Sequence, residues 1–62
     1  MEIGKKIKQL RVAKGITQES LAAELSVSPQ AISKWECDIT MPDIQLLPKL
    51  AILFGVTIDE LF

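Results

Sequence analysis

Hydrophobic residues recur three or four positions apart along the whole chain, as on one face of an α-helix, and nowhere alternate as in a half-buried strand. Ile3, Ile7 and Leu10 form the first such face. The pattern predicts an all-α fold in a single domain spanning residues 1–62. We expect five helices with short connections, at about Glu2–Lys14, Gln18–Leu25, Pro29–Cys37, Ile44–Phe54 and Ile58–Leu61.

Residues that begin or end helices stand at the expected boundaries. Gly15 can end the first helix in the left-handed conformation, and Thr17 can cap the second. Ser28 and Pro29 can begin the third, because serine is a good cap and proline in a first turn needs no partner for its missing N–H. Pro48 lies close enough to the start of the fourth helix to be tolerated there.

The second and third expected helices present different faces. The second has an apolar side formed by Leu21, Ala22 and Leu25. In the third, one side is apolar and the other mainly polar: Ala31, Ile32 and Trp35 against Gln30, Ser33, Lys34 and Cys37. An inward-packing helix, a tight break and a helix with an outward polar stripe are typical of a helix-turn-helix reader of DNA.

The overall charge is unusual for such a reader. The net charge is −1 and the pI about 5.2, without the basic excess of most nucleic-acid binders. The charge is unevenly distributed, since residues 1–37 carry six basic and four acidic side chains, and residues 38–62 carry one and four. The basic half contains the candidate reading element. We therefore expect weak long-range attraction to phosphate and an affinity that depends steeply on salt.

Other classes of protein lack support in the sequence. One cysteine cannot form an intrachain disulfide, no apolar run approaches the roughly 18 residues of a membrane span, and the N-terminus lacks the apolar segment of a signal peptide. These features predict a cytoplasmic protein without a membrane partner. With no histidine, no metal-ligand spacing and no phosphate-cradling glycine loop, we expect no enzyme, metal, cofactor or small-molecule substrate.

Four segments together resemble the Cro and phage-repressor helix-turn-helix family, the XRE-like domains. They read LR-x-x-x-G-I-T-Q-E-x-L-A, V-S-x-x-x-I-S-K-W-E, P-D-I-x-L-L and LFGVTIDELF, and they cover essentially the whole chain. The resemblance implies a compact five-helix lambda-repressor-like domain that binds double-stranded DNA, with the second and third helices as the helix-turn-helix. It further implies a transcriptional regulator acting as a homodimer on a palindromic operator.

The resemblance also implies roles for individual residues. The family's phosphate contact at the start of the second helix falls on Gln18, with Thr17 and Cys37 as further phosphate neighbours. The base-reading positions of the third helix fall on Ser28, Pro29, Gln30, Ser33 and Lys34. Gln30 can pair with adenine and Lys34 can reach guanine. Arg11 and Glu36 are implied to form a partly buried salt bridge with a structural role.

Departures from the family pattern favour a rival function. Pro29 offers a base no hydrogen-bond donor, Ser26 stands where glycine is commonest, and Cys37-Asp38 replaces the usual Asn-Gly after the recognition helix. With the acidic pI, these residues support a protein-interaction or oligomerisation domain of the same fold that no longer binds DNA. For a dimer, the expected surface is the apolar, acidic C-terminal part with Ile52, Ile58, Leu61 and Phe62.

Overall fold

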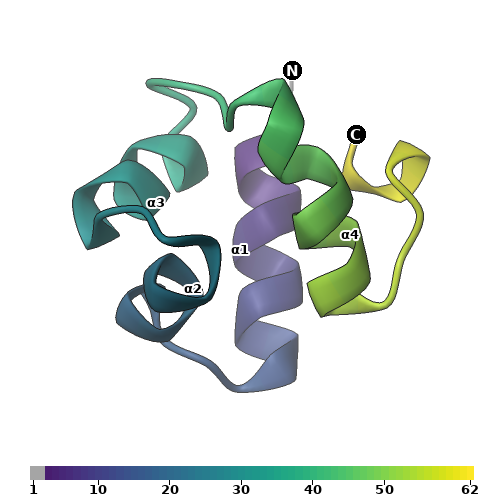
Figure 1. Cartoon of the computed structure of the whole chain (residues 1–62), viewed down its shortest axis with the longest axis horizontal. Coiled ribbons are helices and arrows are strands. Elements are labelled where there is room, and N and C mark those ends of the chain that lie inside the picture. Colours follow the sequence, from purple (N-terminus) through teal and green to yellow (C-terminus); the bar gives the residue numbers. More distant parts are fainter. Residues whose placement is uncertain (1–2) are drawn as a thin grey trace.

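The computed structural model describes residues 3–62, and these fold into four α-helices and two 3₁₀ turns. The α-helices are α1 (Ile3–Lys14), α2 (Gln18–Leu25), α3 (Pro29–Glu36) and α4 (Leu47–Phe54), and the 3₁₀ turns are η1 (Ile44–Leu46) and η2 (Asp59–Leu61). In Figure 1, α1 runs through the middle of the view, with α2 and α3 on one side and α4 on the other. The all-α prediction is confirmed. The expected start of the first helix, Glu2, lies outside the described residues.

The prediction of five α-helices was wrong in two places. The fourth expected helix begins as η1 and becomes α-helical only at Leu47, which brings Pro48 into the first turn of α4. A continuous helix from Ile44 would have set the proline ring against the Ile44 carbonyl, four residues back. The fifth is the single turn η2, and three hydrogen bonds of i to i+3 spacing run through it, the first from the Glu60 amide to the Thr57 carbonyl.

Each of the four α-helices ends in the same hydrogen-bond pattern, in which one residue adopts the left-handed conformation. Glycine occupies this position after α1 and α4, as expected, with φ of 76° and 67° at Gly15 and Gly55. Ser26 after α2 and Asp38 after α3 both have φ of 58°, which costs a residue with a side chain about 1–2 kcal/mol. Asp38 turns the chain, so α3 ends at Glu36, one residue before the expected end at Cys37.

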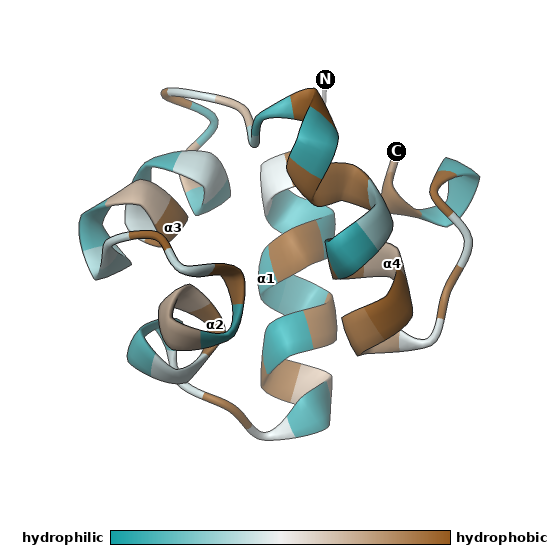
Figure 2. Cartoon of the chain, viewed as in Figure 1, coloured by the Kyte–Doolittle hydropathy of each residue, from teal (hydrophilic) through white to brown (hydrophobic). Residues whose placement is uncertain are grey.

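A single hydrophobic core joins the helices. Ile3 and Ile7 of α1 are 1% and 0% exposed. The other buried core residues come from α2, α3, α4 and η2: Leu21, Ala22, Leu25, Ile32, Trp35, Leu50, Ala51 and Leu61. Hydrophobic and hydrophilic bands follow one another along α1 and α3, as the helical spacing predicts (Figure 2). Leu61 is 0% exposed, so its assignment to a dimer surface was wrong, because it fills the core beside α1 instead.

The N-terminus of α1 lies directly against the end of α3. A Cβ atom added to Gly4 would overlap the backbone carbonyl oxygen of Trp35, so the two helix backbones approach as closely as glycine allows. The Gly4 amide also donates a hydrogen bond of 3.1 Å to Asp38 Oδ1. This carboxylate satisfies an amide that the first turn of α1 would leave unpaired, and it lies at the positive end of the helix dipole.

Candidate nucleic-acid interface

Side-chain caps define where α2 and α3 begin. Thr17 Oγ1 accepts a hydrogen bond of 3.0 Å from the Ser20 amide, and Ser28 Oγ accepts one of 3.2 Å from the Ala31 amide. Pro29 occupies the first turn of α3. Between the helices, the Val27 amide donates to the Ala22 carbonyl at 3.0 Å, which closes the turn. The predicted bounds of α2 and the predicted start of α3 are confirmed.

The expected base-reading residues form the outer side of α3. Ser28, Pro29, Gln30 and Lys34 are exposed, and Ser33 is half-buried. On the opposite side, Ile32 and Trp35 are 0% and 4% exposed, so packing fixes the rotation of the helix. Gln30 and Lys34 lie one helical turn apart, and neither side chain makes a hydrogen bond or ion pair with any other residue in 3–62. Both are therefore available to an external partner.

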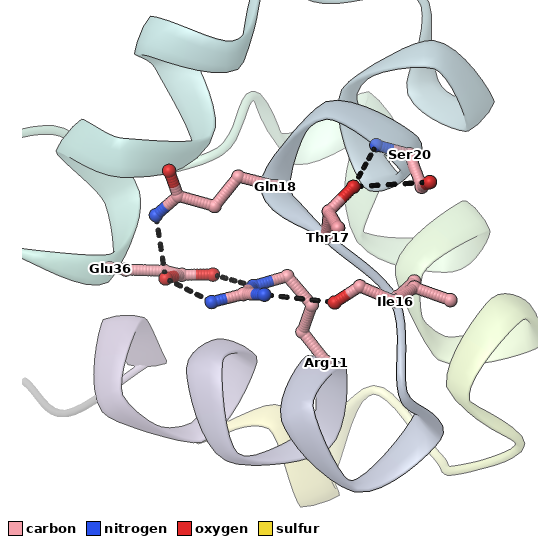
Figure 3. A network of polar contacts seen from close by, with 6 residues as sticks. All are labelled: Arg11, Ile16, Thr17, Gln18, Ser20 and Glu36. Carbon is pink, nitrogen blue, oxygen red and sulfur yellow. Dashed lines mark hydrogen bonds and ion pairs between the residues drawn. The ribbon is translucent and has the colours of Figure 1, made fainter.

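A network of polar side chains ties α1, α2 and α3 together (Figure 3). Arg11 donates from Nε to Glu36 Oε2 at 2.6 Å and from Nη2 to Glu36 Oε1 at 3.2 Å. Its third donor, Nη1, bonds the Ile16 carbonyl at 2.9 Å, just before α2. The two side chains are only 12% and 3% exposed. This geometry is the two-pronged contact that guanidinium groups make with carboxylates.

Gln18 belongs to the same network, which the sequence did not indicate. Its Nε2 donates to Glu36 Oε1 at 3.0 Å, so the amide points toward the end of α3 (Figure 3). An amide nitrogen carries two hydrogens, and this bond occupies one of them. Gln18 therefore keeps one N–H donor while its orientation is fixed by Glu36.

The other two residues expected near phosphate are less well suited to it. The Thr17 hydroxyl accepts from the Ser20 amide and donates to Ser20 Oγ at 3.2 Å, so both of its roles are already in use. Cys37 is exposed but lies at the C-terminal end of α3, the negative end of the helix dipole. Of the three, Gln18 has the best position for an anion, at the first residue of α2.

The carboxylates nearest the end of α3 are paired within the protein. Glu36 is paired with Arg11, and Asp38 accepts from the amide of Gly4. Glu19, in the first turn of α2, stays exposed and adds a negative charge beside Gln18. Lys34, in the last turn of α3, is the basic residue of the reading helix. Asp38 keeps its negative charge, but its carboxylate is directed toward the N-terminus of α1.

The ion pair makes stability depend on pH. Burial raises the pKa of Glu36, but hydrogen bonds from Arg11 and Gln18 and the charges of Arg11 and Lys8 outweigh it, so the pKa lies below 4.5, its ordinary value. A depressed pKa in the folded state adds stability above the unfolded-state pKa, and this is lost as pH falls through the folded value. We expect urea midpoints to stay level between about pH 5 and 7 and to fall below about pH 4.5. Glu36→Gln should flatten that fall, and an unchanged slope would show that other groups cause it.

Sequence reasoning overlooked the contact between Gly4 and Asp38, which joins α1 to the end of α3. The available signal was a glycine inside a strongly periodic helix, since such a glycine often marks a close backbone approach. No metal-ligand cluster and no helix long and apolar enough to cross a membrane occur within residues 3–62.

Comparison with known proteins agrees with this arrangement. The helix-turn-helix family matches residues 7–61. The HTH-type transcriptional activator BcrR of Enterococcus faecalis is 49% identical over 61 residues, which cover 98% of this chain and 30% of BcrR. The HTH-type transcriptional regulator ImmR of Bacillus subtilis is 36% identical over 61 residues, with coverages of 98% and 48%. The chain thus spans less than half the length of either regulator.

A solved structure shares the fold. The restriction-modification controller protein C.AhdI of Aeromonas hydrophila matches with a TM-score of 0.87 at 28% identity, over 98% of this chain and 92% of that one. The similarity confirms a lambda-repressor-like fold, here with four α-helices and a final 3₁₀ turn. Together with the matched residues, it shows that the chain belongs to the XRE/Cro-like helix-turn-helix family of DNA-binding transcription regulators, which is not a family of enzymes.

Proposed function

We propose that this chain is a sequence-specific DNA-binding domain of a transcriptional regulator and that α3 reads the major groove. The observation that carries the proposal is the outer side of α3, where Gln30 and Lys34 are exposed and unpaired while Ile32 and Trp35 anchor the helix. Gln30 can pair with N6 and N7 of adenine, and Lys34 can donate to O6 or N7 of guanine. Ser28 and Ser33 add hydroxyl groups, and Pro29 can contact a thymine methyl group.

Gln18 fixes the position of α3 on the duplex through a phosphate. The free N–H of its amide and the N-terminus of α2 face the same anion, while the hydrogen bond to Glu36 restrains the side chain in advance. A restrained side chain loses less conformational entropy on binding than a freely rotating one. The Arg11–Glu36 pair thus supports phosphate binding without itself contacting DNA.

The domain acts as a homodimer on a palindrome, with recognition helices about 34 Å apart. Ile52 is 82% exposed and lies in a shallow groove between α2 and α4, which is also lined by Glu24, Leu25, Lys49 and Leu53. A groove that carries an acid, a base and an exposed isoleucine is suited to a self-complementary two-fold contact. Ile58, 41% exposed, extends the apolar surface of the C-terminal part.

Two substitutions separate base reading from phosphate binding. Lys34→Ala should remove about 1–3 kcal/mol of discrimination at one base position. Gln18→Ala should weaken binding to all sequences alike and leave the salt slope nearly unchanged, because an uncharged amide releases no counterion from the DNA. Both are measured by fluorescence anisotropy on the preferred duplex and its single-base variants. Gln9→Ala, on the far side of α1, is the control. If both variants keep the wild-type affinity and preference, the reading face is assigned wrongly.

The rival function, a protein-interaction domain that has lost DNA, is supported by a different surface. Ile39, Met41 and Ile44 follow the recognition helix and are 70%, 49% and 78% exposed, and the whole chain is acidic. Clustered exposed apolar residues are typical of protein interfaces. If this function holds, the same anisotropy titration at low salt will give no sequence preference for the wild-type chain, even as a fused dimer.

A further inference from the structure

The side of α1 that faces away from the core is apolar at its centre. At about 100° per residue, Lys5, Gln9 and Val12 project opposite the buried Ile3 and Ile7. Val12 is 59% exposed, although the same helix buries both isoleucines completely or nearly so. Single exposed valines are common on protein surfaces, but Val12 lines a shallow depression.

Two adjoining shallow depressions run along this side of α1. One is lined by Lys5, Lys8, Gln9, Val12 and Ala13, and most of its surface is carbon. The other shares Lys5 and Gln9 and adds Lys6 and Phe62, which is 55% exposed. From Lys5 to Ala13 the helix rises about 12 Å, so the surface accommodates two to three turns of another helix.

The charge of this surface selects its partner. Three lysines and no carboxylate line the two depressions, in a chain whose net charge is −1. The charges of Lys8 and Lys6 act on Glu36 and Glu60, but none of the three lysines forms an ion pair within residues 3–62. A nucleic acid would satisfy the lysines but would leave Val12 and Phe62 uncovered, whereas carboxylates beside an apolar ridge would satisfy both.

We propose that the outer surface of α1, formed by Lys5, Lys6, Lys8, Gln9, Val12, Ala13 and Phe62, binds an acidic amphipathic helix of a partner protein. The apolar ridge of that helix covers Val12 and Phe62, and its flanking carboxylates meet the lysines, in the helix-in-groove mode of recognition. The interface is small, so the complex is expected to be weak and transient. Gly4 and Arg11 face α3 from a different side of α1, and Lys8, whose charge acts on Glu36, marks the edge of the surface nearest α3.

The test uses a helical peptide of about 15 residues, with leucines at i, i+3, i+4 and i+7 and glutamates beside them, titrated into the ¹⁵N-labelled chain. Amide shifts should be confined to residues 5–13 and Phe62. Val12→Ser and Lys5→Glu/Lys8→Glu should each weaken binding about tenfold or more. Lys14→Glu, which reverses the charge of an exposed lysine of α1 outside this surface, should leave it unchanged. Thermal melts establish that each variant is folded.

Three results would overturn the proposal. The first is a set of amide shifts centred on α3 or α4. The second is equal affinity for a glutamate peptide without leucines, because charge alone would then explain the binding. The third is displacement of the peptide by duplex DNA, which would make this side of α1 part of the nucleic-acid interface. None of these results bears on whether α3 reads DNA, which the Lys34 and Gln18 variants test separately.

Discussion

Replacing Arg11 with alanine is expected to lower the free energy of unfolding by about 3–5 kcal/mol, because Glu36 is left as a buried carboxylate without its partner. Glu36 is only 3% exposed in the folded protein, and it loses two of its three side-chain donors, keeping the hydrogen bond from Gln18. The Ile16 carbonyl also loses the hydrogen bond that holds the entry to α2. A domain of this size has a total stability of roughly 3–9 kcal/mol, so urea denaturation should show a variant that is marginally stable or already unfolded in water.

Two further variants show whether charge or geometry is responsible. Arg11→Lys keeps the charge but cannot bond both carboxylate oxygens and the Ile16 carbonyl at once, so it should recover only part of the stability. Replacing both partners, as in Arg11→Met with Glu36→Leu, leaves no unpaired charge and should recover most of it. If Arg11→Ala melts like the wild type, the pair contributes nothing to stability.

Gly4→Ala is expected to destabilise the protein by about 1–3 kcal/mol, the cost of forcing an atom into closely packed structure. At a solvent-exposed position inside a helix, replacing glycine with alanine stabilises by about 1 kcal/mol. The sign of the effect therefore shows whether the added Cβ meets the Trp35 carbonyl. The added Cβ must push α1 away from the Trp35 carbonyl, which also lengthens the Gly4–Asp38 hydrogen bond. Chemical denaturation monitored by the fluorescence of Trp35 reports the change.

Gly15→Ala provides the matched control. Nothing lies within 4 Å of a Cβ at Gly15, so its cost comes only from the left-handed backbone, about 1–2 kcal/mol. Asp38→Ala tests the hydrogen bond separately and leaves the glycine in place. A Gly4→Ala variant that is more stable than the wild type would show that α1 and α3 are not in backbone contact.

Local signals were sufficient to predict the helix-turn-helix. Thr17, Ser28 and Pro29 act on the residues immediately after them, so the bounds of α2 and the start of α3 could be read from the chain. The conformation after the helices was harder to predict. Ser26 and Asp38 adopt the left-handed conformation where the amides of Val27 and Ile39 bond back to the helix, although glycine is preferred at such positions.

Contacts between distant residues could not be predicted from periodicity. Gly4 and Asp38 are 34 positions apart, and Gln18 and Glu36 are 18 apart. A helical pattern shows which side of a helix is buried but not which backbone or carboxylate it meets. For the same reason Leu61 was assigned to the surface, because a short terminal segment gives no sign that it folds back onto α1.

The polar stripe of α3 was predicted well, because Ile32 and Trp35 determine which side is inward. The role of Gln18 changed most. The resemblance assigned it to a phosphate, and the structure adds the hydrogen bond to Glu36 that orients it. Asp38, which the sequence marked only as a departure from the family pattern, accepts a hydrogen bond from the first turn of α1.

Selection of bound duplexes from a random DNA pool at low salt, followed by a salt titration on the preferred sequence, tests the central claim most directly. The account predicts a palindromic motif with half-sites about one helical turn apart, and an affinity that falls steeply with salt. No enrichment, even for two copies fused in one chain, would contradict it and would favour the protein-interaction function.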